Sequence, residues 1–74
     1  MMLSGEDAVV AANGGRVTFD ASQISSRNLK SLTTQVAVMR GSVTICKAEL
    51  LAESIRNELS ILGCGKVSFE FTDA

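Results

Sequence analysis

The spacing of apolar residues changes twice in the second half of this chain, and that change restricts the fold more than any other feature. Val43 and Ile45 alternate with polar or small residues, as in a strand with one buried face. From Ala48 to Leu62 the apolar residues recur every three or four positions, which predicts an amphipathic helix ending at Gly63. Alternation returns over Lys66–Thr72. We therefore predict a strand, a helix and a strand, which form a right-handed βαβ unit if the strands are parallel.

The dipeptide Asn13-Gly14 is the strongest turn signal in the first half. Asn-Gly is typical of a type I′ turn, because both residues tolerate positive φ. It separates the apolar run Ala8–Ala12 from Gly15–Asp20, in which apolar and polar residues alternate. We therefore predict a β-hairpin made of these two segments.

The Ser/Thr-rich stretch that follows predicts a helix from Ser26 to Arg40. Ser25 or Ser26 can cap its start, and Gly41 is well placed just past its end. A rival interpretation makes Gln35–Met39 a strand that pairs with Ser42–Cys46, because β-branched residues alternate there.

These elements predict an α+β fold, a two-layer sandwich in the order β-β-α-β-α-β. Two helices would cover one face of a four-stranded mixed sheet. The rival interpretation gives a ferredoxin-like order, β-α-β-β-α-β, with the same core. All 74 residues would form one domain, with residues 1–7 as a flexible tail, and we identify no internal repeat. The expected core residues are Val17, Phe19, Leu29, Leu32, Val36, Val43, Ile45, Leu51, Ile55, Leu59, Leu62, Val67, Phe69 and Phe71.

The composition argues against most catalytic chemistry. The chain has no histidine, which removes the commonest general base and the usual metal ligand. Cys46 and Cys64 are far apart and lack the spacing of a zinc site. We therefore expect no enzyme, metal or cofactor. The absence of a signal peptide and of a membrane-spanning segment predicts a cytoplasmic protein with free thiols.

The predicted helix over Ala48–Leu62 carries a second, weaker stripe on the face away from the core. Its members are Leu50, Ser54, Asn57 and Ile61. Such a stripe predicts a protein interface. The leading hypothesis is therefore a non-enzymatic protein–protein interaction module, a small regulator, adaptor or inhibitor that acts as a homodimer or bound to a larger protein.

Two alternatives rest on other residues. No carboxylate occurs among residues 21–48, which contain Arg27, Lys30, Arg40 and Lys47. This basic segment could contact phosphates, so a small RNA- or DNA-binding regulator is one alternative, although the net charge of −1 disfavours it. Cys64, between two glycines, is a weaker candidate for a reactive thiol.

The order of predicted elements resembles that of STAS domains, the fold of anti-sigma-factor antagonists. Those domains carry an Asp-Ser-x-Gly phosphoacceptor motif after a strand. Here Cys46-Lys47-Ala48-Glu49 has no hydroxyl, and Ile24-Ser25-Ser26-Arg27 has neither the Asp nor the Gly. The resemblance implies a signalling antagonist as a further alternative and carries no site residue with it.

Overall fold

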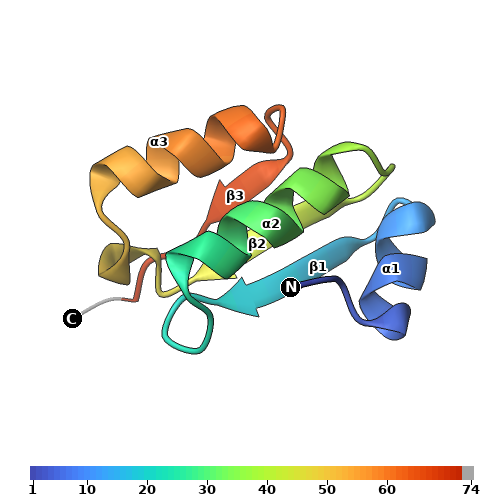
Figure 1. Ribbon diagram of the computed structural model, residues 1–74, viewed down its shortest axis with the longest axis horizontal. Helices are drawn as coiled ribbons and strands as arrows, with labels where there is room; N and C mark the ends of the chain where they lie inside the picture. The colour runs from blue at the N-terminus through green and yellow to red at the C-terminus, as the bar shows by residue number, and fades with distance from the viewer. Residues whose placement is uncertain (73–74) are drawn as a thin grey trace.

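The structure, a computed structural model, describes residues 1–72 and contains helices and parallel strands that alternate along the chain (Figure 1). The elements are helix α1 (Gly5–Ala12), strand β1 (Arg16–Asp20), helix α2 (Ser26–Ala37), strand β2 (Ser42–Cys46), the short 3-10 helix η1 (Ala48–Leu50), helix α3 (Glu53–Leu62) and strand β3 (Val67–Phe69).

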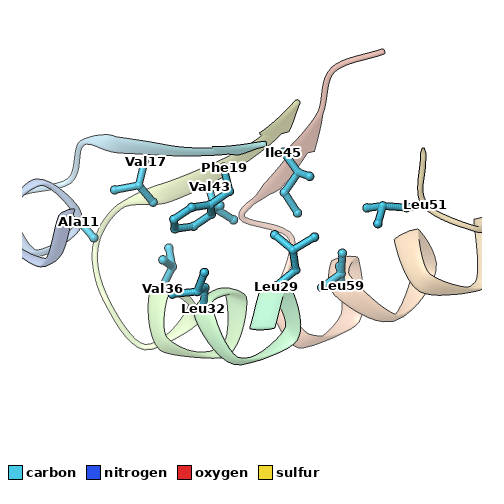
Figure 2. Close-up of a cluster of buried hydrophobic side chains, with 10 residues drawn as sticks. All are labelled: Ala11, Val17, Phe19, Leu29, Leu32, Val36, Val43, Ile45, Leu51 and Leu59. Atoms are coloured by element: carbon cyan, nitrogen blue, oxygen red, sulfur yellow. The ribbon is translucent and has the colours of Figure 1, made fainter. Parts of the chain in front are cut away.

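The described strands form one parallel sheet in the order β1-β2-β3. Helices α2 and α3 lie on the same face of this sheet, and the core fills the space between them and the strands (Figure 2). The βαβ unit predicted for the second half is confirmed. The four-stranded mixed sheet with two helices is wrong, because the described chain has three helices and three strands that are all parallel.

A repeat underlies this arrangement. The tetrapeptides that begin at Val17, Val43 and Val67 read Val-Thr-Phe-Asp, Val-Thr-Ile-Cys and Val-Ser-Phe-Glu, and the sheet register aligns their first three residues. Each strand follows a helix and a glycine-containing turn. This likeness between the strand segments was not identified from the sequence alone. Units of about 25 residues that each stack on the next are the arrangement of solenoid proteins.

The predicted hairpin is wrong because Ala8–Ala12 belongs to α1. Ser4 caps this helix by accepting a hydrogen bond from the Asp7 N–H (3.1 Å), and acidic residues occupy the first turn, where the helix dipole favours them. The Asn13 side chain donates to the Val9 carbonyl oxygen (3.0 Å), and Gly14 adopts a φ of 86°. Asn-Gly therefore ends a helix here instead of turning a hairpin.

Helix α2 begins at Ser26, as predicted, with the Ser25 hydroxyl accepting from the Asn28 N–H. It ends at Ala37, three residues before the predicted end. The rival strand over Gln35–Met39 is wrong, because its first three residues lie in this helix. The ferredoxin-like alternative, which depended on that strand, is wrong for the same reason.

Helix α3 begins at Glu53, five residues later than predicted. Lys47 has a left-handed conformation (φ 56°), which turns the chain sharply after β2. Ala48 and Leu51 then insert into the interior, so the first turn of the predicted helix becomes η1 followed by an extended residue. The final strand is also shorter than predicted, three residues instead of seven.

Most of the predicted core is confirmed. Nine predicted residues are buried, namely Val17, Phe19, Leu29, Leu32, Val36, Val43, Ile45, Leu51 and Leu59. Ile55, Val67 and Phe69 are partly buried against them. Leu62 is partly buried but lies outside this core, and Phe71 is exposed, so these two predictions were wrong. The structure adds Ala11 and Ala48, which are fully buried.

The residues expected as a tail include the first turn of α1 and contact α2. The Met1 carbonyl oxygen accepts hydrogen bonds from the side chains of Ser31 (2.9 Å) and Gln35 (2.8 Å). The Leu3 N–H donates to Gln35 Oε1 (2.9 Å), and its side chain packs against the core. The N-terminal segment therefore covers the first repeat.

Candidate functional site

The predicted apolar stripe lies on the outside of the molecule but does not run along one helix. Ile61 is 78% exposed near the end of α3, where Ser54 and Asn57 are also exposed. Leu50 is 59% exposed and belongs to η1, before α3 begins. The helical spacing that linked Leu50 to the other three therefore does not hold in the structure.

The four predicted phosphate contacts are dispersed over the surface. Lys30 pairs with Glu58 (3.0 Å), which joins α2 to α3, and Lys47 pairs with Asp20 (3.6 Å). Arg27 lies in the first turn of α2, and Arg40 follows its end, so about 15 Å of helix separates them. Two of the four cations are therefore paired with carboxylates, and Arg40 lies at the opposite end of α2 from Arg27.

The repeats reveal a surface that sequence reasoning missed, the free edge of β3. The inward-facing residues Val17 and Phe19 in β1, and Val43 and Ile45 in β2, are at most 8% exposed. Their counterparts in β3, which are Val67 and Phe69, are only partly buried. Phe71, two residues beyond, is 50% exposed. Burial thus decreases toward the last repeat.

Backbone groups at this edge also lack partners. Lys66 C=O accepts from the Val43 N–H and Glu70 N–H donates to the Ile45 carbonyl, so alternate residues of this segment face β2. By the alternation of a parallel ladder, the N–H and C=O groups of Val67 and Phe69 point away from the sheet. Unpaired groups on an edge strand are a template for an added strand. We call Val67, Phe69 and Phe71 the β3 edge.

Arg56 of α3 lies beside the β3 edge. Its guanidinium donates to the carbonyl oxygens of Leu51 (2.7 Å) and Ala48 (3.3 Å), which fixes η1 against α3. The same group lies 5.2 Å from the centroid of the Phe71 ring, within cation–π distance. No motif around Arg56 in the sequence indicates this role.

The second notable surface is the sheet face opposite the helices, which we call the open face. Thr18, Thr44 and Ser68 lie side by side across the three strands at its centre. Thr18 and Ser68 are exposed, whereas Thr44 is 2% exposed. The Oγ1 of Thr44 has no hydrogen-bond partner among residues 1–72.

Charged and thiol groups lie at the carboxyl ends of the strands. Hydrogen bonds from the Ser22 hydroxyl and N–H lower the pKa of Asp20 below the ordinary aspartate value. Partial burial, together with Glu70, to which the thiol donates (3.4 Å), raises the pKa of Cys46. A raised pKa keeps a thiol protonated, so Cys46 is poorly suited to nucleophilic chemistry.

Within the described part of the chain, no arrangement for catalysis or cofactor binding is visible. Residues 1–72 enclose no pocket, and they bring together no three His, Cys, Asp or Glu side chains that could hold a metal. Cys64 is exposed with a φ of 52°. None of the described helices is long and apolar enough to span a bilayer.

What the geometry offers is therefore two surfaces, the β3 edge and the open face. Comparison with the models of known protein families, with curated proteins and with solved structures finds no match.

Proposed function

We propose that this chain is a small, non-enzymatic protein–protein interaction module that binds an extended segment of a partner protein along the β3 edge. The observation that carries this proposal is the difference between equivalent positions in the repeats. Ile45 in β2 is fully buried, whereas Phe69 at the same register position is not. Solenoid ends need a cap, because each repeat is buried by its neighbours.

The two ends of the sheet differ in which residues pack beside them. At the first repeat, Leu3 and Ala11 pack against the core. At the last repeat, the Arg56 guanidinium lies near the Phe71 ring, and the Ala48 N–H donates to the Glu70 carbonyl oxygen. Within residues 1–72 no further strand pairs with the outer edge of β1 or of β3, and β3 is the one followed by an exposed aromatic side chain, Phe71.

A strand added beside β3 would use two kinds of contact. Its backbone would pair with the outward N–H and C=O groups of Val67 and Phe69, which supplies affinity. Its alternate side chains would pack near Phe71 and Arg56, which favours an apolar residue next to a carboxylate. We therefore expect the partner segment to be extended, apolar and acidic.

The test blocks the edge without changing a side chain. The 74-residue chain can be assembled chemically by ligation at Cys46, with N-methyl-Phe69 in place of Phe69. N-methylation removes the outward N–H and obstructs strand addition but leaves the bonds to β2. The matched control is N-methyl-Thr18, which makes the same change on the outer edge of β1.

Binding partners are identified by affinity capture and mass spectrometry, and the affinity of each is measured by calorimetry. We expect N-methyl-Phe69 to weaken binding at least tenfold and N-methyl-Thr18 to leave it within threefold of the unmodified chain. Equal affinity of all three chains for every partner would show that the β3 edge is not the binding surface.

The apolar residues Leu50 and Ile61 remain a separate prediction. The double variant Leu50→Glu/Ile61→Glu tests whether they contribute to the same interface. If they do, this variant weakens binding of the partner that N-methyl-Phe69 also loses. If affinity is unchanged, these residues are scattered surface apolar groups, which are common.

A further inference from the structure

We infer that the open face is an interface between two copies of this chain, which stack sheet against sheet with their strands antiparallel and Arg16 of each copy over Asp20 of the other. This inference uses a different surface from the β3 edge. It therefore stands or falls independently of the proposed function.

The first observation is that one face of a parallel sheet is uncovered. Helices α2 and α3 both lie on the same side of the three strands (Figure 2). All-parallel sheets almost always have both faces covered. The open face carries small side chains at its centre, so a second sheet can approach to the usual distance of about 10 Å.

The second observation is the layout of charge along β1. Arg16 and Asp20 are both on the open face, at opposite ends of the strand and about 13 Å apart. Glu70, just past β3, adds a second carboxylate at the same end as Asp20. Lys47 pairs with Asp20, but both side chains of that pair are more than a third exposed. Asp20 can therefore accept a further cation.

This layout distinguishes the two symmetric ways of stacking. In the first, the two-fold axis lies midway between the sheets and runs perpendicular to the strands. It sets β1 over β1 of the second copy, with the strands antiparallel, and brings Arg16 over Asp20. An axis parallel to the strands sets β1 over β3 instead and brings Asp20 over Glu70, which are like charges. Electrostatic complementarity of this kind determines register and orientation. The charges therefore favour the antiparallel stack.

The centre of the face fits the same arrangement. The two-fold axis passes through the row of Thr18, Thr44 and Ser68, so hydroxyls face hydroxyls, and each can donate and accept. The unpartnered Oγ1 of Thr44 lies at the middle of this row. Because Thr44 is buried, the hydroxyls that meet across the axis are those of Thr18 and Ser68, which are exposed.

The dimer should be weak, because three short strands bury less than the roughly 1,600 Å² of a standard interface. It would leave both β3 edges free, since these lie at the side of the sheet. A pair of modules would then bind a two-site partner more tightly than one module does.

Sedimentation equilibrium over a concentration series up to about 1 mM tests self-association at low salt. We expect the unmodified chain to dimerise and Arg16→Asp to raise the dimer dissociation constant at least tenfold. The double variant Arg16→Asp/Asp20→Arg exchanges the charges and should return to within threefold of the unmodified chain. Arg27→Asp, the same change of charge on exposed α2, is the matched control and should also stay within threefold.

Thiol crosslinking tests the orientation. In the antiparallel stack, Ser42 lies over Cys46 of the second copy. Ser42→Cys, combined with Cys64→Ser, should therefore give 42–46 crosslinks between copies with a short bis-maleimide, because the roughly 10 Å between the sheets is too long for a disulfide. The alternative stack gives 42–42 and 46–46 crosslinks instead. A monomeric chain at the highest concentration, no effect of Arg16→Asp, or predominance of the 42–42 and 46–46 linkages would overturn the inference.

Discussion

Gly41 lies where the loop before β2 passes against the end of α1. A Cβ at this position would meet the Gly15 carbonyl oxygen, and also the Ala11 Cα at 2.8 Å and its carbonyl oxygen at 2.9 Å. All of these are backbone atoms, which cannot move aside as a flexible side chain could. The packing between the first two repeats thus depends on the absence of a side chain here.

We predict that Gly41→Ala lowers the free energy of unfolding by about 2–3 kcal/mol, because the added methyl group overpacks a rigid contact. Chemical denaturation followed by circular dichroism measures the change. Gly5→Ala is the control: nothing lies within 4 Å of the added Cβ, and alanine favours the helix. If both variants have the stability of the unmodified chain, the contact with α1 is not as close as the structure has it.

Asp20 combines a structural role at the end of β1 with a pH-dependent one. Its Oδ1 accepts from the Ser22 N–H (2.8 Å) and hydroxyl (2.6 Å), and these bonds favour the ionised form. The pKa of Asp20 is therefore lower in the folded than in the unfolded chain. A lowered pKa means that Asp20 contributes stability above its unfolded pKa, and that this contribution is lost as pH falls through the folded pKa.

We predict that Ser22→Ala raises the pKa of Asp20 toward the ordinary aspartate value. Carboxyl-carbon NMR titration measures it directly. The unmodified chain should also lose more stability than Ser22→Ala as the pH falls below about 4. Equal pKa values in the two chains would mean that the hydrogen bond from the Ser22 hydroxyl does not form in solution.

The helices differ in how their first turns are capped. Ser4 and Ser25 supply side-chain caps to α1 and α2, whereas Ala52 precedes α3 and supplies none. Ala52 is exposed and already has the extended backbone of a capping residue (φ −62°, ψ 151°). A side chain that accepts a hydrogen bond would therefore fit without rearrangement.

We predict that Ala52→Ser raises the free energy of unfolding by about 1 kcal/mol, since an uncapped N–H of α3 gains an acceptor. Ser25→Ala, at the equivalent position before α2, should lower it by about the same amount. Thermal and urea unfolding of both variants measure these two changes in the free energy of unfolding. A destabilised Ala52→Ser variant would show that α3 begins elsewhere, for example at Ala48 as the sequence alone suggested.

The elements differ in how well the sequence predicts them. β2 and the start of α2 followed from alternation and from the Ser25 cap, which are local signals. The hairpin prediction failed because Asn-Gly suits a helix end as well as a tight turn, and only the packing of Ala11 against the sheet decides between them. The start of α3 was misplaced for a similar reason, because burial of Ala48 outweighs its helix propensity.

The candidate surfaces were harder to predict than the elements. The β3 edge and the open face exist only because three similar segments align in register. The similarity is hard to see in the sequence because equivalent positions hold different residues, such as Phe19, Ile45 and Phe69. Exposed Ile61, in contrast, was identified from helical spacing alone. Periodicity thus locates surface residues on one helix, whereas a surface shared by several strands requires their order.

At the scale of the whole molecule, stability should decrease from the middle repeat to the last. A solenoid is stabilised by contacts between neighbouring repeats, so β2, with a neighbour on each side, should open only when the whole chain unfolds. β3 has one neighbour and ends after three residues. Its opening should therefore require less free energy than global unfolding.

Two measurements test this gradient. In native-state hydrogen exchange, the Glu70 amide, which bonds to the Ile45 carbonyl, should exchange through local opening, whereas the β2 amides should exchange only through global unfolding. Ile45→Ala should lower the free energy of unfolding by about 3–4 kcal/mol, and Phe69→Ala, at the equivalent but only partly buried position, by about half as much. Equal losses, or equal protection of the two strands, would mean that the last repeat is already covered in solution. In that case a partner bound along the β3 edge must be present in the sample, and dilution should restore the gradient.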